Sequence, residues 1–189
     1  MNTPKTFYRE LDALLARIDK DSSGKNFLPS LIVELEQNFG KDLRIFDGCI
    51  YEQRDTEFIL IFSTGKNQWI KKIPVDTVNI EQVLEHGSFI YDNSSIENHC
   101  ELIADNSNII PAAISINSPE GQWLIVFGLT DGWIREEVTL FLNAMRTALN
   151  YRLFSDIIKN ELQQTVQIQK SLLPRKSPEF PGFEIYGRS

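Results

Sequence analysis

The chain has 189 residues and a formal net charge of −7, from 19 Lys and Arg against 26 Asp and Glu. This length suits one domain with an appendage, and the acidic balance excludes nucleic acid as a first choice of partner because phosphate backbones repel it. Two cysteines, Cys49 and Cys100, are too few for a disulfide scaffold or a four-thiolate zinc site. The start lacks the apolar core of a secretion signal, and the longest apolar run, residues 58–62, is far too short to cross a membrane. We therefore expect a cytoplasmic protein that binds neither nucleic acid nor membranes.

Two amphipathic helices are predicted at the start of the chain. In residues 6–20 apolar side chains recur at helical spacing, and the polar cluster at residues 21–24 interrupts the pattern. A second helix is expected over residues 28–39, with Gly40 as its end because glycine commonly follows the last helical residue. Beyond Gly40 the periodicity becomes that of strands.

The middle of the chain predicts a sheet of six strands. Residues 58–62 are apolar on both faces, as in a central strand, and the proline and glycine of residues 118–121 suit a tight reversal. The expected strands are residues 43–51, 58–62, 68–73, 88–91, 109–117 and 122–129, with a short helix at 79–85 and a polar loop at 92–108. Together they predict an α+β domain with a single, mostly antiparallel six-stranded sheet flanked by helices.

The last third of the chain predicts one long helix. Residues 136–173 contain neither glycine nor proline, which implies a continuous helix of roughly 40 residues. Its first half carries a wide apolar stripe that suits a sheet, whereas the narrower stripe of its second half has nothing to cover within one chain. We therefore expect a parallel homodimer through this signalling helix, with packing against a downstream domain as the alternative. The expected seam residues are Leu153, Ile157, Ile158, Leu162, Val166 and Leu172.

The end of the chain carries the most specific pattern. A helix ending in Ile-Gln-x-x-Leu-Leu-Pro at residues 168–174 is followed by Pro-x-x-Pro-Gly-Phe-Glu-Ile-x-x-Arg-Ser at residues 178–189. This combination resembles the start of the bacterial PPM-type serine/threonine phosphatase domain of the stage II sporulation E and sigma-factor-regulating type. The preceding region resembles a GAF sensory domain, through its helix and strand order and its exit helix. The exit-helix residues are Ala144, Ala148, Asn150 and Leu153.

The two resemblances imply an organisation and a function. They divide the chain into an N-terminal amphipathic helix (1–24), a GAF-like sensory domain (25–150), a linker helix (151–174) and the truncated start of a phosphatase domain (175–189). They imply a sensory and dimerisation module that controls a phosphatase. The phosphatase domain would use Mn²⁺ or Mg²⁺ and act on a phosphorylated anti-sigma-factor antagonist. The aspartates of that metal site do not occur before Ser189, so we expect the chain itself to be no enzyme and to hold no metal or cofactor.

Other functions stay open at this point. The same GAF-like domain would suit another output, such as a histidine kinase or a nucleotide cyclase, although residues 135–173 lack the histidine that a kinase linker carries. GAF-fold reductases of free methionine sulfoxide need several convergent cysteines, and Cys49 and Cys100 lie in dissimilar settings. We predict no catalytic residue, and the identity of any small-molecule ligand is open. The expected pocket residues are Trp69, Phe89, Tyr91, His99 and Cys100.

Overall fold

The computed structural model describes residues 4–18, 27–65, 69–92, 102–103, 109–118 and 121–172. Its elements are α1 (Pro4–Ile18), α2 (Phe27–Leu43), β1 (Ile45–Arg54), β2 (Glu57–Ser63), β3 (Lys72–Pro74), α3 (Val78–His86), β4 (Ser88–Ile90), β5 (Ile110–Ser118), β6 (Gly121–Leu129) and α4 (Arg135–Leu172). The six strands form one sheet in the order β3-β2-β1-β6-β5-β4, and every neighbouring pair is antiparallel. The predicted α+β class, the single sheet and the long C-terminal helix are confirmed.

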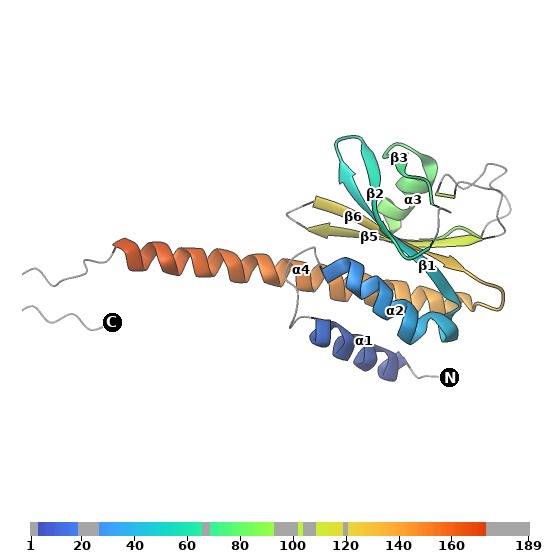
Figure 1. The fold of residues 1–189 in the computed structure, drawn as a ribbon, viewed down its shortest axis with the longest axis horizontal. Coiled ribbons are helices and arrows are strands. Elements are labelled where there is room, and N and C mark those ends of the chain that lie inside the picture. Colours follow the sequence, from blue (N-terminus) through green and yellow to red (C-terminus); the bar gives the residue numbers. More distant parts are fainter. Residues whose placement is uncertain are drawn as a thin grey trace, which may run out of the picture.

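The sheet separates two hydrophobic clusters. Helices α1, α2 and α4 lie on one face and α3 lies on the other (Figure 1). The helices of the first face bury leucines and phenylalanines at helical spacing, among them Leu35, Phe141 and Leu149, against the sheet residues Ile50 and Phe127. Because α1 contributes to the same cluster, it is part of the packed domain, whereas the division of the chain into four regions stays a prediction.

Gly40 does not end α2, contrary to the prediction. The helix continues to Leu43, and Arg44 takes the left-handed conformation, with φ of 60°. A Cβ atom at Gly40 would lie 3.1 Å from the carbonyl oxygen of Ile45, so the glycine permits the close return of the chain into β1. A glycine selected for close approach and a glycine selected for a helix end look the same in a sequence.

The third strand also lies elsewhere than predicted. Strand β3 comprises Lys72–Pro74 rather than residues 68–73, and Trp69 instead forms an isolated antiparallel bridge with Ile103. The side chain of Trp69 explains the difference, because its indole N–H donates to the carbonyl oxygen of Asp47 at 2.7 Å and turns the ring inward. Most of the loop predicted at residues 92–108 lies outside the described residues.

Helix α4 covers the sheet with its first half and then leaves the domain as a rod (Figure 1). At the end of the covered part, the amide oxygen of Asn150 accepts a hydrogen bond of 3.1 Å from the backbone N–H of Asn117 on β5. The described helices include none that combines the length and the apolar character needed to span a bilayer.

Candidate functional site

The sheet face under α3 is the candidate ligand site. Its cluster contains three aromatic residues with polar tips, Tyr51, Trp69 and Tyr91, and every one of them is almost fully buried. The other buried members of this cluster are Cys49, Phe58, Ile73, Ile80, Val83, Leu102, Ala113, Leu124 and Val126. Aromatic and aliphatic side chains of this kind line small-molecule sites in proteins, with a few polar groups for orientation.

The polar tips of the three aromatic residues all bind backbone carbonyls. Besides the Trp69 bond to Asp47, the hydroxyl of Tyr51 donates to the carbonyl of Ile70 at 2.9 Å, and that of Tyr91 donates to the carbonyl of Asn79. These bonds satisfy groups that would otherwise be costly to bury. They also fix the rings in positions that fill the face.

A short strap crosses this face. It consists of residues 69–70 paired with residues 102–103, through the bridge of Trp69 with Ile103 and a 3.2 Å bond from the N–H of Ile70 to the carbonyl of Leu102. Leu102 is fully buried beneath it. A molecule that enters the cluster must therefore displace this strap or one of the aromatic rings.

Two buried polar groups beside the aromatic rings are of chemical interest. Asn79, at the start of α3, is only 4% exposed, and its Oδ1 has no hydrogen-bond partner in the structure. An unpaired buried acceptor costs about 1–3 kcal/mol, which a donor on a bound molecule would recover. Burial also raises the pKa of the Cys49 thiol well above its ordinary value, against hydrogen bonds with Tyr51 and with the backbone of Val126 that lower it. Cys49 is therefore a neutral thiol and a weak nucleophile in this state.

The predicted pocket residues are partly brought together. Trp69 and Tyr91 belong to the buried cluster, and Phe89 packs against it, with its ring 4.9 Å from that of Tyr91. His99 and Cys100 lie outside the described residues. Sequence reasoning missed Tyr51 and Asn79, whose roles depend on contacts across the fold.

A bulge in β1 anchors this face to α2. Asp47 takes a left-handed conformation with φ of 47°, and the register of β1 against β6 shifts between Phe46 and Cys49. The carboxylate of Glu36 on α2 accepts hydrogen bonds from the N–H of Gly48 and, at 2.7 Å, from the hydroxyl of Thr64. Burial raises the pKa of the Asp47 carboxyl. The bulge thus holds the carbonyl that binds Trp69.

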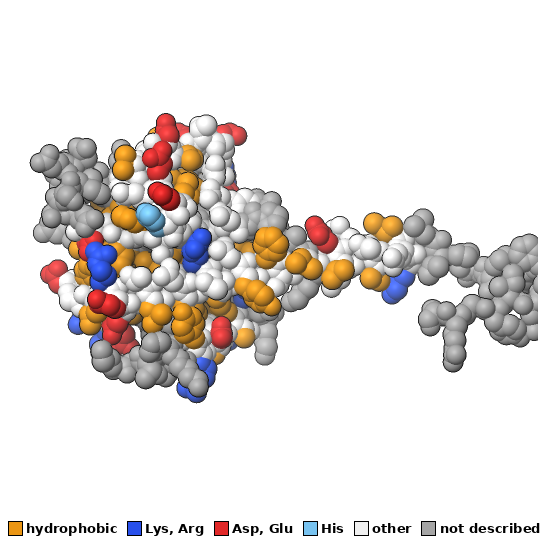
Figure 2. Space-filling model, turned by 180° about the vertical axis from the view of Figure 1, so that it is seen from behind, with side chains coloured by type: hydrophobic (Ala, Val, Ile, Leu, Met, Phe, Trp, Pro, Cys, Tyr) orange, Lys and Arg blue, Asp and Glu red, His pale blue; other side chains and the backbone are white. Residues whose placement is uncertain are grey.

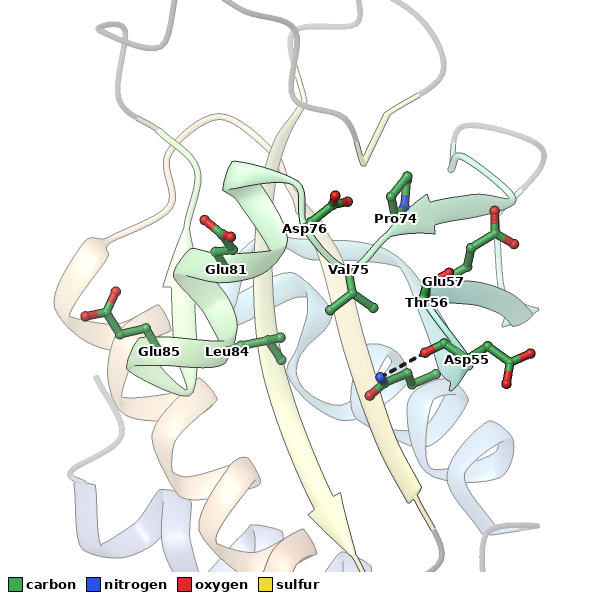
Figure 3. A pocket seen from close by; sticks show the side chains of 10 residues that line it. Asp55, Thr56, Glu57, Pro74, Val75, Asp76, Glu81, Leu84 and Glu85 are labelled. Carbon is green, nitrogen blue, oxygen red and sulfur yellow. Dashed lines mark hydrogen bonds between the residues drawn. The ribbon is translucent and has the colours of Figure 1, made fainter.

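A separate hollow lies at the sheet edge, between α3, β3 and the turn from β1 to β2 (Figure 3). Its volume is about 1050 Å³ and its rim is acidic, with Val75 and Leu84 as apolar lining. The carboxylates around it are Asp55, Glu57, Asp76, Glu81 and Glu85. Lys72 pairs with Glu57 at 3.4 Å, and both side chains are largely exposed. Among the residues that the structure describes, no group of three or more histidine, cysteine or carboxylate side chains is arranged to hold a metal ion.

The exit of α4 provides a second functional surface. Along its outer half, hydrophobic side chains are exposed in steps of three and four residues (Figure 2). We call Tyr151 (76% exposed), Phe154 (53%), Ile158 (48%), Leu162 (60%) and Val166 (46%) the outer stripe. Tyr151 lies two residues from Leu149 and from Leu153, which is about 200° around a helix, so the outer stripe faces away from the core side of α4.

The predicted seam therefore needs one correction. Leu153 is 4% exposed and packs in the core under the sheet, because it continues the face of Met145 and Leu149. Ile158, Leu162 and Val166 are exposed on α4. The side chains of Ile157 and Leu172 lie outside the description, and Tyr151 and Phe154 were missed.

The fold resembles that of known GAF domains. A free methionine-R-sulfoxide reductase from Neisseria meningitidis, solved with its substrate, superimposes with a TM-score of 0.61 at 13% identity over 81% of this chain and 91% of that one. A Staphylococcus aureus structure titled fRMsr, also with substrate, gives 0.60 at 16% identity over 77% and 95%. A putative GAF sensor protein from Burkholderia vietnamiensis gives 0.56 at 12% identity over 82% and 98%. No protein-family model matches the chain, and neither does any curated protein. The chain thus has a GAF-like fold.

The expectation that the chain is no enzyme is wrong as it was argued. It rested on the missing phosphatase aspartates, yet several structures with the same fold are methionine-R-sulfoxide reductases, whose chemistry needs no such metal site. The fold therefore admits catalysis as well as sensing.

Proposed function

We propose that this chain is the sensory and dimerisation module of a signalling protein, with α4 as its output. The observation that carries the proposal is the outer stripe on the side of α4 that faces away from the core. A helix that only covered the sheet would need one apolar face, whereas α4 has two faces that overlap between Leu149 and Phe154.

A second copy of α4 is the partner that the composition of the outer half favours. Between residues 155 and 172, two acidic residues are matched by two basic ones, so that this segment is neutral in a chain of net charge −7. Self-association along it brings no net repulsion. Steps of 3, 4, 4 and 4 from Tyr151 to Val166 average 3.75 residues, longer than the 3.5 of a left-handed coiled coil, and favour a nearly straight pair of helices.

Input would arrive at the sheet face under α3. A molecule that donates a hydrogen bond to Asn79 would displace the strap or an aromatic ring from the sheet. Such a molecule regulates the output only if it binds two arrangements of α4 with different affinity. The sheet links the two sites, because β5 and β6 contribute side chains to both hydrophobic clusters.

The output that we propose is a PPM-type serine phosphatase domain downstream, on the strength of the motif at residues 168–189. In this proposal the phosphatase domain binds Mn²⁺ or Mg²⁺ and dephosphorylates an anti-sigma-factor antagonist. The chain described above contributes the dimer and the signal.

An insertion series tests this transmission in the protein together with whatever its gene encodes after Ser189. Inserting two residues between Gln163 and Gln164 turns the outer part of α4 by about 200°, whereas seven residues turn it by roughly −20° and add length alone. We expect Mn²⁺-dependent release of phosphate from a phosphoserine protein to change severalfold with two residues and to stay near wild type with seven. Equal activities in both insertions would contradict transmission through the helix.

A reductase of free methionine-R-sulfoxide is the second candidate, favoured by the two substrate-bound structures of this fold. A thiolate would attack the sulfoxide sulfur, release methionine and keep the oxygen as a sulfenic acid. A second thiol would then expel water to form a disulfide, which an external dithiol reduces. Incubation with free methionine-R-sulfoxide and dithiothreitol, followed by chromatography, measures the methionine formed. Production that Cys49→Ser or Cys100→Ser abolishes would support this activity, and production equal to the protein-free control would refute it.

A further inference from the structure

The turn where α4 leaves the domain is also the meeting point of α1 and α2. Helix α1 ends at Ile18, and α2 begins at Phe27, which is fully buried. The α4 turn between Leu149 and Leu153 packs in the same cluster. In this turn the core face of α4 gives way to the outer stripe.

One side chain of this turn contacts all three helices. Arg152 on α4 donates from its guanidinium to the carbonyl oxygen of Leu15 at 2.8 Å, and its Cζ lies 4.3 Å from the centre of the Phe27 ring. Carbonyls in the last turn of a helix have no intrahelical partner and carry partial negative charge, so the end of α1 is a favourable acceptor for a cation. A guanidinium over an aromatic face adds a cation–π contact, which is stronger where water is excluded.

The remaining contacts of α1 show why this bond matters. Leu11, Leu14 and Leu15 are buried against the core. The ion pair between Arg17 and Glu34 on α2 spans 3.0 Å, but its side chains are 65% and 37% exposed, and such pairs contribute little. Helix α1 is therefore held by three leucines and by the guanidinium of α4.

We infer that Arg152 is a positioning residue that makes α1 a latch on the output turn of α4. While α1 is docked, Arg152 fixes how the turn with Tyr151 and Phe154 is rotated about the helix axis. A partner or an upstream segment that pulls α1 away removes the acceptor at Leu15, and the start of the outer stripe is released. This inference rests on the proposed function only in giving the released turn a role in signalling.

Hydrogen exchange followed by mass spectrometry tests the latch in the full chain. Arg152→Gln keeps a side chain of similar reach but removes the charge, and Arg152→Lys restores the charge without the planar stack. Arg146→Gln is the matched control, because Arg146 also lies on α4 and donates at 3.3 Å to the carbonyl of Ser115, on the sheet. Amides of β6 serve as the internal reference for global stability.

We expect Arg152→Gln to speed exchange at least tenfold in both α1 and residues 149–160, relative to β6. Arg152→Lys should lie between this variant and wild type, and Arg146→Gln should leave α1 within threefold of wild type. The latch is refuted if Arg152→Gln leaves α1 unchanged, or if Arg146→Gln affects α1 equally.

Sedimentation equilibrium separates the two proposals. A monomeric wild-type chain in which Arg152→Gln still loosens α1 would sink the dimeric output and keep the latch. A dimer whose α1 does not respond to Arg152→Gln would keep the dimeric output and sink the latch.

Discussion

A single lysine in the outer stripe should weaken the dimer strongly. Leu162 is 60% exposed in the single chain, and full burial of a leucine side chain is worth about 1.5–3 kcal/mol. Covering the exposed part therefore contributes about 1–2 kcal/mol per subunit, or about 2–4 kcal/mol in a symmetric dimer that contains the residue twice. Leu162→Lys removes this contribution and places two ammonium groups close together. We expect the dimer Kd to rise by about 30- to 700-fold.

The assay is sedimentation equilibrium over a range of protein concentrations, with circular dichroism to check that the fold is kept. Gln164→Lys is the control, because it adds the same charge about 200° around the helix from Leu162. It should leave the dimer Kd within about threefold of wild type. Equal Kd values for wild type and Leu162→Lys would refute the role of the outer stripe, as would an equal loss in Gln164→Lys.

Three further changes probe the sheet. Glu36→Gln weakens charge-assisted bonds to the β1 bulge and to β2 and should cost about 1.5–3 kcal/mol in urea unfolding, whereas Glu34→Gln, in an exposed pair, should cost less than about 1 kcal/mol; equal costs would contradict this role. Because burial raises the pKa of Asp47, its native form binds protons more readily than the unfolded chain, so stability falls as pH rises from the ordinary value of 3.8 through the raised one. Asp47→Asn should flatten this fall in urea titrations at several pH values, and an unaltered pH profile would disprove it. In the Cys100→Ser variant, Cys49 should resist a thiol reagent at pH 7 until urea unfolds the chain, and fast labelling of the native protein would show that the thiol is accessible.

The features that could be predicted are those set by local pattern. The absence of glycine and proline from residues 136–173 was enough to predict α4, and alternating or continuous apolar runs were enough to predict the sheet. Gly40 misled because close approach to Ile45 and a helix end require the same residue. Trp69 misled because its conformation is set by a carbonyl 22 residues earlier in the chain.

The functional contacts were harder to predict for a related reason. Arg152 reaches Leu15 across 137 positions of the sequence, and Glu36 reaches Thr64 across 28. Periodicity within a window of residues carries no information about such pairs. It did indicate that the outer half of α4 has an apolar stripe, but Leu153 belongs to the core because the buried face of the first half continues one turn further than expected.

The shortness of the outermost strands has a consequence for crowded solutions. Strands β3 and β4 have three residues each, and beyond β4 the edge of β5 is occupied by the Asn150 side chain. A foreign peptide that seeks to extend the sheet finds few free amides there, which hinders fibre growth by strand addition. Overexpressed chains that do clump should accordingly retain their native secondary structure and fail to bind amyloid dyes.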